Sequence, residues 1–239
     1  MAHGPDTVSL DRGRKMTALV VNSNSGATAT TTASYACPLP ASLVSGNKLY
    51  LFVGTVILAT VYSLDTPSGW TLEADLQNND ASTHPRLTIF SKTSDGSEGA
   101  TVTVAITGGT PSVNFSVVSV QIQNHNGTDV SGMDRTGSVK TTLASPSVTT
   151  TVNDSLVLLA NVSYLNLVTR VVIPAINITA VANATIQLYC GVCYTTQGSA
   201  GATTAQTWAF DDTDIAVSAT VAVKPALSGP APIIAWFRA

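Results

Sequence analysis

A six-residue sequence that occurs twice constrains the fold of this chain more than any other feature. "GSEGAT" at residues 96–101 returns as "GSAGAT" at residues 198–203. In a chain rich in Gly, Ala, Ser and Thr, six residues can agree by chance, so the flanking sequences decide whether the two copies are related. If the flanks agree as well, the chain is a duplication, and each half must form an equivalent structural unit.

The flanking sequences agree in four blocks that keep the same order. The blocks pair residues 45–53 with 152–160, Pro67 with Pro174, residues 86–101 with 188–203, and residues 115–123 with 216–224. In the first block Leu49 lies opposite Leu156, and Leu51 lies opposite Leu158. The chain is therefore predicted to be an internal duplication with a period of about 100 residues, far longer than the repeats of solenoids or propellers.

The local pattern of each half predicts short β-strands. Apolar runs alternate with turn-forming clusters of Gly, Pro, Asp and Asn, and no stretch keeps a helical period for three turns. In the first half the predicted strands cover residues 16–23, 48–63, 70–76, 86–93, 101–107 and 113–123. Hydrophobic residues make up 44% of the chain and charged residues only 10%, against about 25% in typical domains. We expect an all-β fold, an antiparallel, jelly-roll-like β-sandwich, because a sheet with one apolar face must bury it.

The predicted organisation has four parts. Residues 1–15 form an extended N-terminal arm, residues 16–124 the first β-sandwich repeat unit, residues 125–138 a polar connector, and residues 139–239 the second unit with a C-terminal strand. The sequence leaves open whether the halves form separate sandwiches or interleave in one jelly roll. The short connector favours one intimate body.

The two ends of the chain contain the candidate docking residues. Arg12, Arg14 and Lys15 place three cations in the polar arm, where they suit an acidic groove on a partner. Near the other end, four large apolar side chains occur within five positions: Ile233, Ile234, Trp236 and Phe237. In water such a run is an aggregation hazard, so it either closes the sandwich as a last strand or docks on a neighbouring subunit.

Charge and composition exclude several classes of partner. The net charge of −3 gives no basic field for nucleic acid or for a membrane surface, and no apolar stretch is long enough to span a membrane. The first residues lack the apolar core of a secretory signal, and three cysteines are an odd count without a disulfide framework, so we expect synthesis in a reducing cytoplasm. The few charges favour self-association into a homo-oligomer.

Catalytic and metal-binding chemistry finds little support in the sequence, and we expect no enzyme activity and no cofactor. "CGVC" (190–193) resembles a metal or redox motif, but it lies on a predicted strand, where residues three apart point to opposite faces. Zinc needs further ligands and a redox pair needs a helix N-terminus, so we expect buried structural thiols. The acidic run "DDTD" (211–214) lacks the spacing of a calcium loop and is expected to be a solvated turn.

The strand and turn motifs of the first half resemble a known module. "SGNKLYLFV", then "TPSGWT", then "RLTIFSKTSDGSEGATVTVAIT", then "VNFSVVSVQIQN" are similar to a recurrent β-sandwich module of tailed-bacteriophage virion proteins, over roughly residues 28–226. In the second half Asn177 stands where the motif has Trp70. The family occurs in tail fibres, head fibres and capsid-decorating proteins, and it brings no catalytic residues.

The resemblance implies a structural protein of the virion, made in the host cytoplasm. We expect a capsid decoration or cement protein that binds other virion proteins, either the major capsid protein or neighbouring subunits, through its arm and sheet edges. The alternative is a tail- or head-fibre module that binds host surface glycans. In that case Trp70 and Trp208 are the candidate sugar-stacking residues, although both fit a core position as well.

Overall fold

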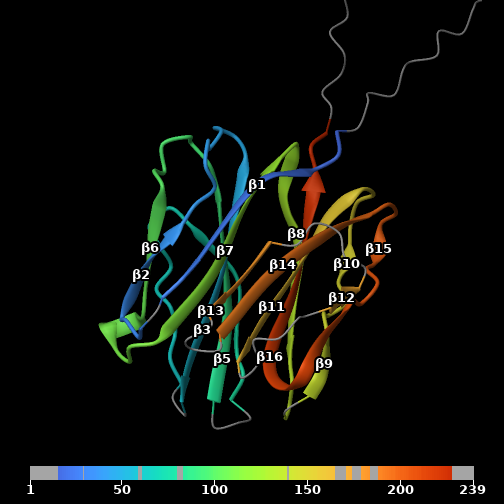
Figure 1. Cartoon of the computed structure of the whole chain (residues 1–239). Helices are drawn as coiled ribbons and strands as arrows, with labels where there is room; N and C mark the ends of the chain where they lie inside the picture. Colours follow the sequence, from blue (N-terminus) through green and yellow to red (C-terminus); the bar gives the residue numbers. More distant parts are fainter. Residues whose placement is uncertain are drawn as a thin grey trace, which may run out of the picture.

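The computed structural model describes residues 16–28, 30–58, 61–79, 83–138, 140–164, 171–173, 179–183 and 188–227 (Figure 1). These residues form β-strands joined by turns and loops, with one short 3₁₀ turn, η1 (Thr107–Gly109). Every strand pair is antiparallel. The predicted all-β, antiparallel class is confirmed. No helix in the described part of the chain is long and apolar enough to cross a membrane.

The first half of the chain builds one five-stranded sheet and one small sheet. The large sheet has the order β1 (Leu19–Ala27), β7 (Asn114–Gln123), β3 (Lys48–Leu58), β5 (Thr83–Thr93) and β4 (Thr71–Gln77). The small sheet pairs β2 (Ser34–Pro38) with β6 (Thr101–Ala105). Five of these strands coincide with predicted segments. The strand predicted at residues 48–63 is shorter in the structure, where β3 ends at Leu58.

The second half also builds one large sheet and one small sheet. Its large sheet runs β8 (His125–Arg135), β16 (Thr207–Pro225), β11 (Ser155–Tyr164), β14 (Leu188–Gln197) and β13 (Thr179–Asn183). The long strand β16 also pairs with β9 (Lys140–Ala144) and β12 (Val171–Ile173). The small sheet pairs β10 (Thr149–Thr150) with β15 (Gly201–Ala202).

In both halves the strands pair in a nested way. The first half pairs β1 with β7, β2 with β6 and β3 with β5. The second half pairs β8 with β16, β10 with β15 and β11 with β14. The two "GS-GAT" sequences occupy equivalent places in this scheme: one leads from β5 to β6, the other from β14 to β15.

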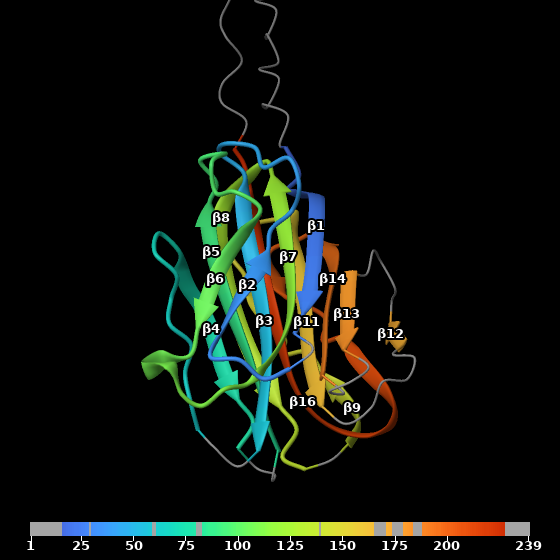
Figure 2. The ribbon, with the colours of Figure 1, turned by 60° about the vertical axis from the view of Figure 1, so that its left-hand side comes forward.

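Strands of the two large sheets lie against one another (Figure 2). Their inner faces contribute to one buried cluster that holds Tyr50, Phe52 and Val120 from the first sheet with Leu158 and Val221 from the second. At one side edge β4 lies against β8, and at the other β1 lies against β13. Among the described residues, the largest buried apolar cluster therefore combines side chains of both halves.

A second layer of core covers the outer face of each large sheet. In the first half, Leu49, Leu51 and Phe90 point outward and are buried with Cys37 and Val104 of the small sheet. In the second half, Val157, Leu159 and Cys193 are buried with Trp208. Strands β3 and β11 are consequently covered on both faces, which explains why their sequences are apolar at nearly every position.

The outward direction of Leu49 and Leu51 corrects the predicted pairing with Leu156 and Leu158. The latter two point into the core between the sheets, so the proposed alignment of this block is wrong by one residue. In a strand that is apolar on both faces, alternation does not mark the inner side, and a slip of one residue exchanges the faces. By contrast, the block 115–123 keeps its faces: Val120 and Val221 both point into the inner cluster.

The predicted connector at residues 125–138 is also a correction, because it forms strand β8 and pairs with β16. Its polar residues face strand β4 at the edge of the other sheet. Ser131 Oγ donates to the carbonyl oxygen of Glu73 (3.1 Å), and Arg135 Nη1 donates to that of Gln77 (2.9 Å). The polar side chains of this segment form hydrogen bonds to the edge of the other sheet. A polar strand of this kind has the composition of a loop, which is why the sequence predicted a connector.

Candidate functional site

The residues predicted to dock on a partner fall outside the described part of the chain. This applies to Arg12, Arg14, Lys15, Ile233, Ile234, Trp236 and Phe237. The structure shows where the described chain begins, after the arm, and where it ends, before the C-terminal segment. The candidate site is therefore built from the first described residue, Met16, the last, Leu227, and their surroundings.

Both described ends of the chain lie at the same end of the molecule, which we call the terminal end (Figure 1). Leu19 of β1 pairs with Gln123, and Pro225 of β16 pairs with His125, only two residues further along the chain. Beyond that pair, the backbone N–H of Ala226 donates to the carbonyl oxygen of Asn124 (2.7 Å). The reversal between β7 and β8 thus holds both chain ends next to each other.

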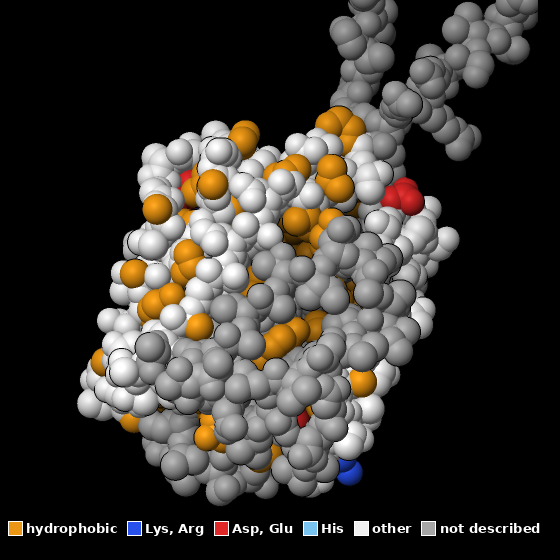
Figure 3. All heavy atoms as spheres, in the orientation of Figure 1, with side chains coloured by type: hydrophobic (Ala, Val, Ile, Leu, Met, Phe, Trp, Pro, Cys, Tyr) orange, Lys and Arg blue, Asp and Glu red, His pale blue; other side chains and the backbone are white. Residues whose placement is uncertain are grey.

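Large apolar side chains are exposed at this end. Met16, Leu19 and Val21 are exposed by 45, 46 and 39%, and Leu227 by 77%. The backbone N–H of Val44 (53% exposed) approaches Gln121 Oε1 (3.4 Å) on β7, and Gln121 pairs with Asn22 of β1. Figure 3 shows hydrophobic side chains on the surface where the chain leaves the body. Exposed apolar groups that gather at one place indicate an interaction surface more than single ones do.

A pocket of about 390 Å³ opens at the same end, between the loop 39–43 and the turn 96–100. Its wall includes Asn24, whose Nδ2 donates to the carbonyl oxygen of Leu39 (2.8 Å). Glycines and short side chains make up much of the rest. No charged residue lines the pocket. The pocket therefore suits contact with a neutral surface better than binding of an ion.

Charged groups at this end are paired with one another. Lys92 Nζ lies 3.1 Å from Glu98 and 3.2 Å from Asp95, and Lys224 Nζ lies 3.7 Å from Asp129. Hydrogen bonds from Ser97 hold the pKa of Asp95 at about 2, below its usual range. The described surface at the terminal end consequently offers no strong field of one sign.

Neither tryptophan proposed for sugar stacking is available to a ligand. Trp70 is 9% exposed and packs in the outer core of the first half, and Trp208 is 1% exposed in that of the second half. The indole Nε1–H of Trp208 donates to Ser145 Oγ (2.8 Å), which satisfies its polar edge. The glycan-contact prediction for these two residues is therefore wrong, because each ring fills the space beneath a small sheet or loop.

The three cysteines are free and buried, as predicted for Cys190 and Cys193. Cys190 points into the core between the sheets and Cys193 into the outer core, so the "CGVC" motif is split between two faces of β14. Burial raises the pKa of Cys37, Cys190 and Cys193 to about 12. No group of three or more His, Cys, Asp or Glu side chains gathers in the described residues in a way that could hold a metal ion.

This burial predicts thiols that resist labelling. At pH 8 a thiol of pKa about 12 is ionised in roughly one molecule in ten thousand, and the thiolate is the reactive form. Native protein mixed with a thiol reagent such as Ellman's reagent is expected to show no reaction over minutes, whereas denatured protein releases three equivalents per chain. One thiol that reacts at once in the native protein would contradict the buried positions.

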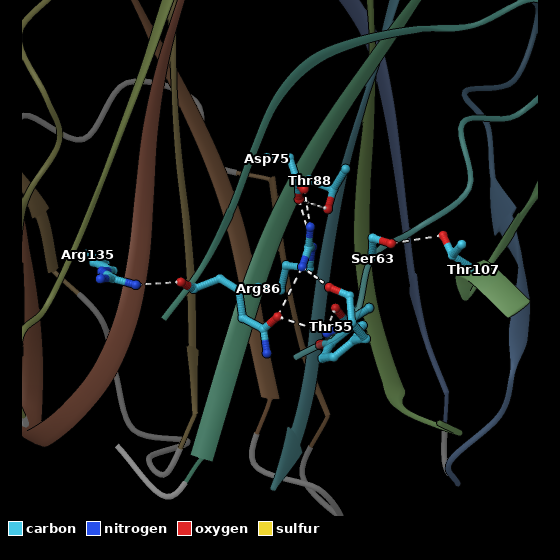
Figure 4. A network of polar contacts seen from close by, with 9 residues as sticks. Thr55, Ser63, Asp75, Arg86, Thr88, Thr107 and Arg135 are labelled. Atoms are coloured by element: carbon cyan, nitrogen blue, oxygen red, sulfur yellow. Dashed lines mark hydrogen bonds and ion pairs between the residues drawn. The ribbon is translucent and has the colours of Figure 1, made fainter. Parts of the chain in front are cut away.

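A buried polar network surrounds Arg86 on β5 (Figure 4). Its guanidinium forms an ion pair with Asp75 of β4, with Nε 2.7 Å from Oδ1, and also donates to Gln77 Oε1 (3.0 Å) and to the carbonyl oxygen of Tyr62. Thr88 Oγ1 donates to the same carboxylate (2.7 Å). The guanidinium carbon lies 5.5 Å from the centre of the Tyr62 ring.

This network holds a loop and does not present a reactive group. Tyr62 belongs to the segment that follows β3, and its hydroxyl donates to Thr55 Oγ1 (2.7 Å) on that strand. Burial raises the pKa of Tyr62, which keeps the phenol neutral. Every donor discussed here has an acceptor within the fold, so the network is a structural lock. The network could have been predicted from the sequence, because Arg86 begins an apolar predicted strand and Asp75 lies on the predicted strand before it.

The acidic run 211–214 lies inside strand β16, so the predicted solvated turn is a further correction. The pairing register with β9 shifts between Ala209 and Asp214, which shows that the strand is irregular at this point. Asp214 is buried, and its Oδ1 accepts from the backbone N–H of Ile215 (2.7 Å). Its carboxylate is therefore engaged within the fold.

The terminal end is the one described region that combines exposed apolar groups, a pocket and both chain ends. No protein-family model, curated protein or solved structure matches this chain.

Proposed function

We propose that the chain is a non-enzymatic structural protein of a bacteriophage virion, which decorates or cements the capsid surface and attaches through its terminal end. One observation carries this proposal: both described chain ends leave the fold beside the exposed side chains of Met16, Leu19 and Leu227. Fifteen residues precede this end and twelve follow it. An attachment made there uses the arm, the C-terminal segment and the apolar surface together.

The turn before β4 supports the resemblance to the phage module. The backbone N–H of Trp70 donates to the carbonyl oxygen of Pro67 (3.0 Å), and Gly69 between them has φ +78°. That is the geometry of a tight turn that runs from Pro67 to Trp70 and favours glycine at its third position. The "P-x-GW" sequence thus has a local structural reason, and the buried Trp70 anchors the turn.

For the fold we propose a sandwich of two jelly-roll-like halves that arose by duplication. Three observations support it: the nested pairing in each half, the same strand order in both large sheets, and matching contacts between them. Strand β7 faces β14 as β5 faces β16, and β1 faces β13 as β4 faces β8. Such a pattern is expected when two equivalent units meet across a two-fold axis near β3 and β11.

The proposed partners are other virion proteins, either the major capsid protein or neighbouring copies of this chain in a homo-oligomer. Within the described residues β1 pairs with β7 alone, which makes it an edge strand of its sheet, and edge strands are where sheets of neighbouring chains can meet. Nucleic acid and membranes are not part of the proposal. The alternative, a fibre module that binds host glycans, loses its main support with the burial of Trp70 and Trp208.

Removal of residues 1–15 tests the attachment. We expect the truncated protein to fold, because the described core begins at Met16, and to bind particles that lack the protein roughly 10- to 100-fold more weakly, through loss of three cations. Occupancy is measured by quantitative gel analysis of sedimented particles. The triple variant R12A/R14A/K15A tests the charges alone, and K140A at the opposite end is the matched control. Unchanged occupancy after truncation would count against the arm.

A further inference from the structure

Asn126 and Gly127 form the single Asn-Gly pair in the sequence, and they lie at the start of β8. Asn126 is exposed. Gly127 has φ +78°, a conformation that favours glycine. Around this pair the register with β16 shifts, since Val223 pairs with Thr128 but Pro225 with His125. The backbone here is therefore outside the regular ladder of the sheet.

The backbone N–H of Gly127 donates to a side chain. It points at Nδ1 of His125, with a distance of 3.1 Å between the nitrogens. On the other side of the same ring, Nε2 lies 2.9 Å from the carbonyl oxygen of Gly46. A carbonyl oxygen only accepts, so Nε2 bears the ring proton and Nδ1 offers its lone pair to Gly127. Two independent contacts thus fix the same neutral tautomer.

We infer that Asn126 is a site of spontaneous deamidation for which His125 is the general base. The reaction needs the Gly127 nitrogen to lose its proton and attack Cγ of Asn126, and the imidazole is placed on that proton. A new bond forms between this nitrogen and Cγ, the bond from Cγ to the side-chain amide nitrogen breaks, and ammonia leaves with the proton that His125 returns. Water then opens the cyclic imide to give aspartate or isoaspartate.

The surroundings of His125 keep it in the basic form near neutral pH. Partial burial lowers the pKa of His125, and the positive charge of Lys48 on β3 acts in the same direction. Lys48 itself lies 4.0 Å from Glu73 of β4. A neutral imidazole whose free lone pair faces the reacting N–H is what general-base catalysis requires.

The product changes the terminal end. Each event places a new negative charge between His125 and Thr128, and isoaspartate adds a methylene group to the backbone there. Thr128 Oγ1 forms a hydrogen bond with the Tyr50 hydroxyl (2.7 Å) and donates another to Glu73 Oε1 (2.9 Å). Both partners belong to the first sheet, so a longer backbone beside Thr128 disturbs the contact between the two sheets. This inference does not depend on the proposed function.

The experiment compares the full-length protein with H125Q, in buffer and in urea. Glutamine keeps a polar side chain that can accept a hydrogen bond but is not basic. Deamidation at Asn126 is followed by mass spectrometry of proteolytic peptides. In the native state we expect H125Q to react about 100-fold more slowly than the wild type, at the lower end of the range of general-base effects. In urea, where the geometry is lost, we expect the two rates to be equal.

A pH profile separates a base from a merely structural histidine. The native wild-type rate is expected to level off above the pKa of His125, whereas the rate of H125Q keeps rising with pH because only hydroxide removes the proton. Three results would overturn the inference: absence of deamidation at Asn126 in the native wild type, equal native rates for the two proteins, or profiles of the same shape.

Discussion

Gly54→Val is expected to lower the free energy of unfolding by about 2–4 kcal/mol, because side-chain atoms are added where two sheets already touch. Gly54 lies on β3, and a Cβ atom at this position would come within 2.7 Å of Val162 Cγ2 on β11 and 3.0 Å of the carbonyl oxygen of Ser116 on β7. The backbone oxygen is part of the sheet and cannot turn aside. Denaturant titration followed by tryptophan fluorescence measures the loss.

A double-mutant cycle identifies the cause of that loss. Gly54→Ala adds the Cβ alone, and Val162→Ala removes the methyl groups that it would meet. The combined variant is expected to be less destabilised than the sum of the two single variants, since each change relieves the other. Gly137→Ala is the matched control, because nothing lies within 4 Å of a Cβ there. Additive effects of the two changes would show that β3 and β11 do not meet at this point.

Arg86→Met is expected to destabilise the protein by about 2–4 kcal/mol, because it leaves the carboxylate of Asp75 without its counter-charge. The side chain of Arg86 is 8% exposed and that of Asp75 25%, so solvent compensates for only part of the loss. The carbonyl oxygen of Tyr62 and Gln77 Oε1 lose a donor as well. Chemical denaturation again measures the effect.

Two further variants distinguish the charge from the geometry. Arg86→Lys keeps the charge but cannot reach all acceptors of the planar guanidinium, so it is expected to recover only part of the stability. Asp75→Asn combined with Arg86→Met removes both charges and is expected to be more stable than Arg86→Met alone. If the double variant is no more stable than the single one, the ion pair does not account for the loss.

The fold class and many of its strands follow from the sequence, and the reason is local. Segments such as residues 86–93 and 113–123 combine β-branched residues with flanking turn signals, and both became strands. The split of Cys190 and Cys193 between two cores also follows, since side chains alternate along a strand. These predictions need no knowledge of what lies on the other side of the sheet.

Other features depend on distant contacts and therefore could not be predicted. Strand β8 is polar because Ser131 and Arg135 reach across to the backbone of β4, more than fifty residues earlier in the chain. The inner face of β3 depends on which side meets the second sheet, and an apolar strand does not reveal this. The exposed side chains of the terminal end are separated by most of the chain length, so their proximity appears only once β1 and β16 are folded.

The placement of both chain ends at one end also determines how the fold bears a mechanical load. Antiparallel strands are joined by bonds perpendicular to their length. A force applied between Met16 and Leu227 enters at the pairs Leu19 with Gln123 and Pro225 with His125. Such a force would separate β1 from β7 and β16 from β8 by breaking one hydrogen bond after another, with little shear along the strands. A molecule anchored by both chain ends on one surface therefore carries no unfolding force while the distance between its anchors stays constant. When the anchors are drawn apart, its terminal strands separate sequentially from this end.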